Sequence, residues 1–220
     1  AKQEDLSADE HSSDSDLEKP VIAAAQRPYD CELLGICSFL PKRDLLRFRN
    51  INKRASSIAD IFLKNIYTKI SQEEKNKKLI LAAKKGSVWA TNLMIQSGAN
   101  PCYLFTPIGG IPHEEFNLYS LDSSPFGTTP LMHAAYNGHV DIVRLLLDCR
   151  VNLDIQSCEG MTALNLATKQ GHEKVVRLLL DEGAKIDLID RKGHSPLMWA
   201  SIIGHEALVG LLLDAGADIN

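Results

Sequence analysis

Histidines at a regular spacing and scattered cysteines are the side chains of this 220-residue sequence whose types suit metal or thiol chemistry. Three histidines each follow a glycine and recur every 33 residues: His139, His172 and His205. The five cysteines form no C-x-x-C pair and have no His-x-x-x-His companion: Cys31, Cys37, Cys102, Cys149 and Cys158. Zinc sites and catalytic thiols need ligands or a base at suitable spacing. The pattern predicts structural histidines, reduced thiols, no metal, no cofactor and no enzymatic activity.

The histidine spacing belongs to an internal repeat. Two sets of glycines are 33 residues apart: Gly127, Gly160 and Gly193, and Gly138, Gly171 and Gly204. The aligned segments read GTTPLMHAAYNGHVDIVRLLLDCRVNLDIQ, GMTALNLATKQGHEKVVRLLLDEGAKIDLID and GHSPLMWASIIGHEALVGLLLDAGADIN. They resemble the ankyrin pattern of a TPL turn, a short helix, a GH turn and a V-x-x-LL helix. An earlier copy, LILAAKKGSVWATNLMIQSGANP, lies one period plus 19 residues upstream. The resemblance implies about four ankyrin repeats over residues 71–220.

Several repeated residues have a mechanical role in such a repeat. Thr129 and Ser195 precede prolines, so their hydroxyls are predicted to cap the first helix of their repeats. Paired small residues allow close packing, and leucine triplets fill the space between layers. Glycine is predicted to end the second helix in the left-handed conformation at Gly98, Gly183 and Gly216. Arg150 takes this place in the second copy, which predicts local strain of about 1 kcal/mol or an altered turn.

Positions that packing does not dictate are the candidate binding residues of the stack. Aligning the copies gives His133, Tyr136, Asn137, Leu166, Lys169, Gln170, Trp199, Ile202 and Ile203 on the inner, concave side, with Ser157, Cys158, Glu159, Arg191 and Lys192 at the hairpin tips. In the last copy the inner side chains are apolar. This patch is either a partner interface or a surface that a neighbouring repeat would cover.

An aromatic insertion over residues 102–126 separates the first two copies. It contains Tyr103, Phe105, Phe116, Tyr119 and Phe126, with Gly109-Gly110 at its middle. Two extended arms around the glycines predict a protruding hairpin that contacts a partner through Phe105, Phe116 and Tyr119. The alternative is a loop that folds back on the repeats.

Residues 1–70 precede the repeats and divide into two parts. Residues 1–20 are predicted to be a disordered acidic tail, since residues 1–18 contain seven acids, four serines and almost nothing apolar. Residues 21–70 are predicted to form a helical domain. Its first short apolar helix stops at Pro41, its second starts near Asp44, and its third runs from Ile58 to Ile70.

The run CELLGICSFLPKRDLLRFRNINKRASSIA within residues 28–68 resembles the F-box, a three-helix motif. The resemblance implies docking onto the small Skp-family adaptor of cullin-RING ubiquitin ligases. The adaptor-binding residues would be Leu33, Leu34, Ile36, Phe39, Leu40, Pro41, Leu45 and Leu46. The sequence departs from the family pattern at Pro28, one position early, and at Ala55 in place of tryptophan. The alternative is a helical cap that covers the first repeat.

Together these features predict an all-α fold, an F-box-like three-helix unit followed by an ankyrin-repeat solenoid with short β-hairpin turns. The arrangement resembles cytoplasmic substrate receptors of ubiquitin ligases and effectors of intracellular bacteria that act in the host cytoplasm. An ankyrin scaffold or a regulatory fragment of a larger protein, such as an effector enzyme, stays an alternative. Residues 41–85 contain thirteen Lys and Arg against four acids, but they lack a stacking platform for bases. We expect an unknown protein target, no nucleic acid and no membrane partner.

Overall fold

A computed structural model describes residues 53–106 and 127–219 of the chain. The described residues form α-helices joined by turns, with no β-strand among them, so the predicted all-α fold is confirmed. They belong to two compact units, and the boundary between the units lies between Lys69 and Ile70. The first unit contributes one described helix, α4 (Lys53–Thr68).

Helix α4 covers the third of the helices predicted ahead of the repeats. The prediction placed its start at Ile58, but the helix begins at Lys53. No glycine or proline lies between these positions, and the alanine and serines there are tolerated in a helix, so it extends by five residues. Leu63 is fully buried while Ile61 is exposed, as in an amphipathic helix. The first predicted helix lies outside the described residues, and so does the second except for Lys53 and Arg54, which were assigned to it and belong to α4.

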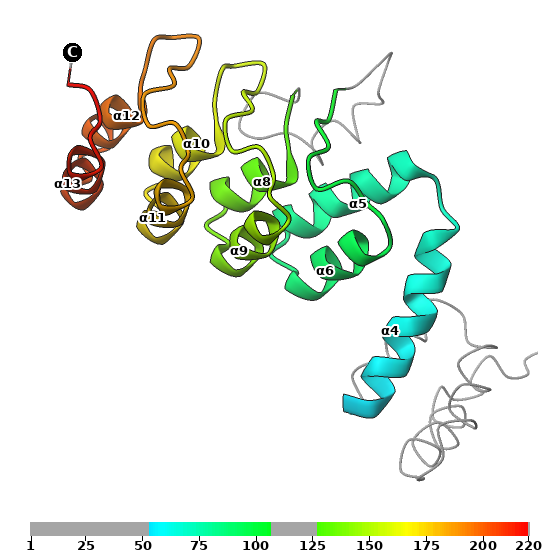
Figure 1. The fold of residues 1–220 in the computed structure, drawn as a ribbon. Coiled ribbons are helices and arrows are strands. Elements are labelled where there is room, and N and C mark those ends of the chain that lie inside the picture. Colours follow the sequence, from blue (N-terminus) through cyan, green and yellow to red (C-terminus); the bar gives the residue numbers. More distant parts are fainter. Residues whose placement is uncertain (1–52, 107–126, 220) are drawn as a thin grey trace, which may run out of the picture. The chain divides into compact units, whose positions relative to one another are not determined.

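The second unit is a stack of four helix pairs (Figure 1). The inner helices are α5 (Gln72–Lys84), α8 (Pro130–Tyr136), α10 (Ala163–Lys169) and α12 (Pro196–Ile202). The outer helices are α6 (Val88–Gln96), α9 (Val140–Asp148), α11 (Glu173–Asp181) and α13 (Glu206–Asp214). Inner helices pack on inner helices and outer on outer, which gives two layers. The long turns between repeats project beyond the inner layer (Figure 1).

Hydroxyl caps start the inner helices, as the sequence predicted. The Thr129 hydroxyl accepts a hydrogen bond from Met132 N at 3.2 Å, and the Ser195 hydroxyl accepts one from Met198 N at 3.3 Å. A proline follows each cap in the first helical turn, where its missing N–H costs nothing. Thr162 caps α10 in the same way. These caps fix where each seven-residue helix begins.

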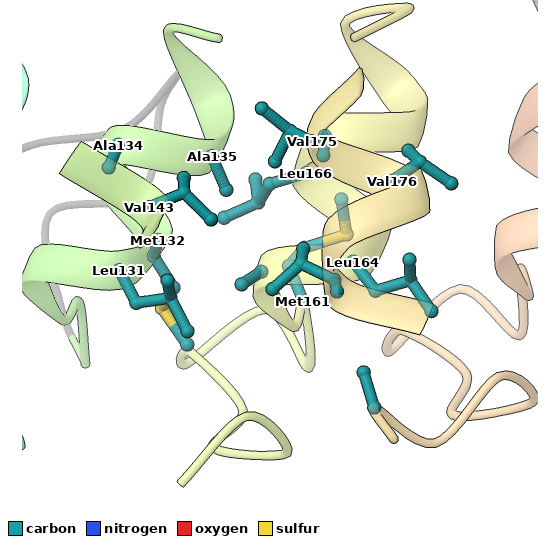
Figure 2. Packing of buried hydrophobic residues seen from close by; sticks show 14 of the residues in the cluster. Leu131, Met132, Ala134, Ala135, Val143, Met161, Leu164, Leu166, Val175 and Val176 are labelled. Carbon is teal, nitrogen blue, oxygen red and sulfur yellow. The ribbon is translucent and has the colours of Figure 1, made fainter. Parts of the chain in front are cut away.

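Small residues and leucines form one continuous core along the stack. Ala134, Ala167 and Ala200 are fully buried on the inner helices, and so are the middle leucines of the outer helices: Leu146, Leu179 and Leu212. Figure 2 shows Ala135 and Val143 of one repeat facing Leu166 and Val175 of the next. Because each repeat buries its side chains on its neighbour, the core depends on stacking.

The first repeat departs from the others through a longer inner helix. Helix α5 has 13 residues where α8, α10 and α12 have seven. Ser71 caps it, and its added first turns hold the loop that follows α6. Gln72 Nε2 donates to the Gly98 carbonyl at 2.7 Å, and Asn100 N donates to Asn76 Oδ1 at 2.8 Å. The repeat alignment missed this extension because no other copy contains it.

The helix ends confirm the prediction made for Arg150. Gly98, Gly183 and Gly216 all have positive φ, between 83° and 90°. Arg150 has φ 53° at the equivalent position, and it is the one non-glycine residue with positive φ in the described part of the chain. The second repeat therefore keeps the turn geometry and tolerates the strain.

The insertion lengthens one hairpin turn of the stack. Ser157 N donates to the Met161 carbonyl and Asp190 N donates to the His194 carbonyl, which closes the two regular turns over four positions. In the first turn Phe105 N donates to the Thr128 carbonyl at 2.8 Å, and Gly127 N donates back to the Phe105 carbonyl. This bridge spans 23 positions, so the 19 extra residues lie within the turn. The insertion was predicted over residues 102–126, and its part from 107 to 126 is outside the described residues.

Candidate functional site

The repeated histidines join successive repeats. His139 Nε2 donates to the Lys84 carbonyl at 3.1 Å, and His172 Nε2 donates to the Tyr136 carbonyl at 3.0 Å. The His172 ring also lies against Gly138, where an added Cβ would come within 2.7 Å of the ring. These contacts explain why glycine and histidine recur together, so the structural role predicted from the spacing is confirmed.

The described residues give thiol and metal chemistry no assembled site. No group of three or more His, Cys, Asp or Glu in residues 53–106 and 127–219 could hold a metal ion. The Cys149 thiol donates to the Leu145 carbonyl at 3.4 Å. Burial, and next the charge of Asp148, raises the pKa of this thiol. A thiol with a raised pKa is a poor nucleophile at neutral pH.

Two rows of equivalent positions run across the ends of the inner helices, and we call them the inner-face rows. The first row is Lys84, Tyr136, Lys169 and Ile202, and the second row is Lys85, Asn137, Gln170 and Ile203. All eight side chains are exposed or half-buried. Six of the nine candidate binding residues on the inner side thus fall on these rows, and the other three, His133, Leu166 and Trp199, lie one turn before them. Sequence reasoning missed Lys84 and Lys85, although the first copy aligns on Gly86.

Trp199 is held in place by three neighbours. Its indole Nε1 donates to Asp190 Oδ2 at 3.2 Å, and the His194 ring meets it edge-on at 5.0 Å between centroids. The Lys169 ammonium lies 5.0 Å from the centre of the indole ring, in cation–π geometry. The indole is therefore fixed before any partner arrives. Fixed aromatic side chains are typical anchors of protein interfaces.

Asp190 organises both the last hairpin turn and the indole. Its Oδ1 accepts hydrogen bonds from Lys192 N at 2.8 Å and His194 N at 2.9 Å. Burial works to raise the pKa of this carboxyl, but the hydrogen bonds from the two backbone N–H groups and from His194 outweigh it and hold the pKa below its ordinary value. The sequence prediction did not single out Asp190. Its alignment with Ser157, whose hydroxyl caps the preceding turn, was the available signal.

The exposed apolar residues of the last repeat belong to two surfaces. Met198 is 43% exposed, whereas its equivalent Met132 is 1% exposed beneath the following repeat, so this side chain lies on a repeat-stacking surface. Ile203 is 40% exposed, and its equivalent Gln170 is exposed even with a repeat stacked after it. Met198 was not part of the predicted patch, and for the patch itself partner binding stays a prediction. Ile203 belongs to the inner face, and Ile202 lies beside it at 59% exposure.

Three of the predicted contact residues are buried, and the prediction for them was wrong. His133 is fully buried and shares a hydrogen bond with the Thr128 hydroxyl at 3.2 Å. Leu166, at the same repeat position, is buried in the core. Phe105 is also buried and packs with Ile80, because the backbone bridge at the base of the insertion turns its ring toward α5. None of the three can reach a partner without unfolding.

The other predicted contacts stay predictions. Tyr136 and Asn137 are half-buried, and Asn137 Nδ2 donates to the His133 carbonyl at the end of α8. Phe116 and Tyr119 lie outside the described residues, as do all the proposed adaptor contacts: Leu33, Leu34, Ile36, Phe39, Leu40, Pro41, Leu45 and Leu46.

Comparison with known proteins assigns the repeats to a family. The family model described as Ankyrin repeats (3 copies) matches residues 79–190 and residues 149–220. These matches cover well over half of the chain, which therefore belongs to the ankyrin-repeat family. Its repeats are a protein–protein interaction module that binds protein partners. No curated protein matches the sequence. The family match begins at residue 79, after the F-box-like segment. In the described part of the chain, no helix is long and apolar enough to cross a membrane.

Proposed function

We propose that this chain is a protein-binding adaptor whose inner face holds a target protein through an apolar anchor on α12. The observation that carries the proposal is the exposure of Ile202 and Ile203 beside the fixed indole of Trp199. Exposed apolar side chains next to an ordered aromatic ring gain most from burial in an interface. The function is to hold the target, so it requires no catalytic side chain and no cofactor.

The proposal extends to the segment ahead of the repeats. Its sequence similarity to the F-box supports a role in docking a Skp-family adaptor, so that the bound target is brought to a cullin-RING ubiquitin ligase. Bringing two proteins together raises their effective concentration, which is sufficient to promote ubiquitin transfer by the ligase. The proposal implies a cytoplasmic location, where the free thiols of the described residues, Cys102, Cys149 and Cys158, would stay reduced.

Target binding is tested by affinity capture from cytosol with matched surface variants. Ile203→Asp places a charge on the inner face, while Val88→Asp places the same charge on an exposed apolar position of outer helix α6. Both variants should keep the helical circular dichroism spectrum, because both side chains are exposed. We expect Ile203→Asp to lose the captured protein and Val88→Asp to retain it. Equal capture by the two variants would contradict the proposed site.

Adaptor binding is tested separately by pull-down with a purified Skp-family adaptor. The full chain should bind, and the Leu40→Ala, Leu45→Ala double variant should not. Ile203→Asp serves as a control because it changes only the repeat surface. Absence of binding by the full chain, or binding that the double variant leaves unchanged, would remove the ligase part of the proposal.

A further inference from the structure

In the last three repeats the carboxylates of the helices lie on the outer layer, which also carries Arg144, Lys174 and Arg177. The outer helices α9, α11 and α13 each carry an acid in the first turn and another at the last residue: Asp141 and Asp148, Glu173 and Asp181, Glu206 and Asp214. The inner helices α8, α10 and α12 contain no carboxylate over their described spans, and Lys169 is their one permanently charged residue. At the hairpin tips Glu159 accompanies two bases, Arg191 and Lys192. Over these three repeats the inner helices therefore offer no carboxylate to repel an acidic partner, whereas the outer helices carry both signs of charge.

The inner-face rows also change character along their length. They begin at α5 with the adjacent lysines Lys84 and Lys85, and they end at α12 with the adjacent isoleucines Ile202 and Ile203. Between these ends, each row passes through polar side chains on α8 and α10. The two ends of the inner face would therefore recognise different chemical groups.

The carboxylates at the start of α5 and in the last hairpin turn are committed to other partners. Glu73 and Glu74 form ion pairs with lysines one turn later on α5, at 3.0 and 2.9 Å. Asp190 is occupied by backbone, indole and imidazole donors. Lys85 is exposed at the end of α5, so an acid on a bound partner can approach its ammonium from solvent.

We infer that the target contributes an extended segment that is acidic where it lies over α5 and apolar where it lies over α12, an inference that rests on the proposed function. Neighbouring helices pack about 8–10 Å apart, so the three steps from α5 to α12 span roughly 25–30 Å. An extended segment covers this distance in about eight or nine residues at about 3.3 Å per residue. The acids and the apolar anchors of the target should be separated by that number of residues.

Selection from a phage-displayed library of random 16-residue peptides on the full chain tests the inference. Enriched peptides should carry an acidic cluster and an apolar cluster in one constant order, about eight residues apart. Lys85→Glu should weaken the binding of such peptides by about three- to tenfold at low salt, and less at high salt, since exposed charge pairs are screened. Lys174→Glu makes the same charge change at an exposed position of outer helix α11 and should alter binding by less than about twofold.

The outcomes separate the inference from the function on which it rests. If the enriched peptides lose binding to Ile203→Asp but show no acidic cluster, or bind Lys85→Glu as tightly as the natural chain, the inference is wrong while the inner-face site stands. If no peptide is enriched, or Ile203→Asp leaves binding unchanged, the proposed function fails and the inference fails with it. If the enriched peptides bind Ile203→Asp and Lys85→Glu more weakly but bind Lys174→Glu normally, the result supports the inner-face site and the inference about the target segment.

Discussion

Replacing Arg150 by glycine should stabilise the repeat stack. The side chain is exposed, but its backbone has φ 53°, where a residue with a Cβ is strained. At the equivalent Gly98, Gly183 and Gly216, an added Cβ would meet nothing within 4 Å, so the strain at this turn comes from the backbone and not from crowding. The turn hydrogen bond from Arg150 N to the Leu147 carbonyl, 2.8 Å long, needs no side chain and should persist.

The magnitude follows from two opposing terms. Relief of the left-handed backbone is worth about 1–2 kcal/mol. Glycine also gains freedom in the unfolded chain, which costs about 0.4–1 kcal/mol of stability. The net gain in the free energy of unfolding is therefore about 0.5–1 kcal/mol. For a unit of this size, that corresponds to a Tm increase of about 1–4 °C.

Arg144→Gly is the matched control for the measurement. Arg144 is exposed in the middle of α9, six residues before Arg150, so the same substitution there should destabilise the helix by about 1 kcal/mol. Urea unfolding followed by circular dichroism at 222 nm would compare the two variants with the natural chain. Opposite signs are expected. A lower midpoint for Arg150→Gly would refute the conclusion that the backbone at this turn is strained.

Three further changes test other contacts of the stack. Asp190→Asn should lower the free energy of unfolding by about 1–2 kcal/mol at pH 7, because charged hydrogen bonds are lost. The pKa of the Asp190 carboxyl is depressed in the folded state, so its contribution to stability is present above the unfolded pKa of about 3.9 and disappears as the pH falls through the folded pKa. The difference in the free energy of unfolding between the natural chain and Asp190→Asn should therefore be smaller at pH 3 than at pH 7. Gly138→Ala should destabilise more than Gly183→Ala in thermal unfolding, since its Cβ would clash with the His172 ring, and adding His172→Ala should recover part of the loss. Deleting residues 107–125 should leave the helical circular dichroism intact, and loss of helicity would show that the stack requires the insertion.

The repeat architecture was predictable from the sequence because the residues that cap and end the helices recur every 33 positions, the same period at which the helix pairs stack. Hydroxyl caps, helix-ending glycines and the GH pairs each occupy fixed positions, and Thr129, Gly183 and His172 have the predicted roles. The irregular Arg150 was predictable for the same reason, since the turn geometry is imposed by the neighbouring turns. The start of α5 was not, because no other copy carries its first six residues.

Burial of individual inner-face residues was not predictable from the alignment. His133, Leu166 and Trp199 share one repeat position, yet the first two are buried and the third is half-buried. The repeat period predicts where each residue lies on its helix, but how far its side chain is buried depends on the hairpin turn beside it. Thr128 bonds to His133, whereas Asp190 holds Trp199 by its indole N–H. Those turn residues differ between copies, so the contacts arise from the departures from the repeat.

The insertion illustrates how such a departure is accommodated by the fold. Ser157 and Asp190 cap their short turns with side-chain oxygens, whereas the side chain of Phe105, at the same position, has no oxygen to accept a hydrogen bond. A tight turn there would lack its cap, whereas a long turn does not depend on one. Closing 23 positions instead of four costs about 1.5 kcal/mol of chain entropy. Burying the Phe105 ring against Ile80 contributes about 1.5–3 kcal/mol, which is enough to offset that cost. The backbone bridge to Thr128 keeps the regular pairing at the base of the turn, so the stack can carry 19 additional residues without changing the spacing of its repeats.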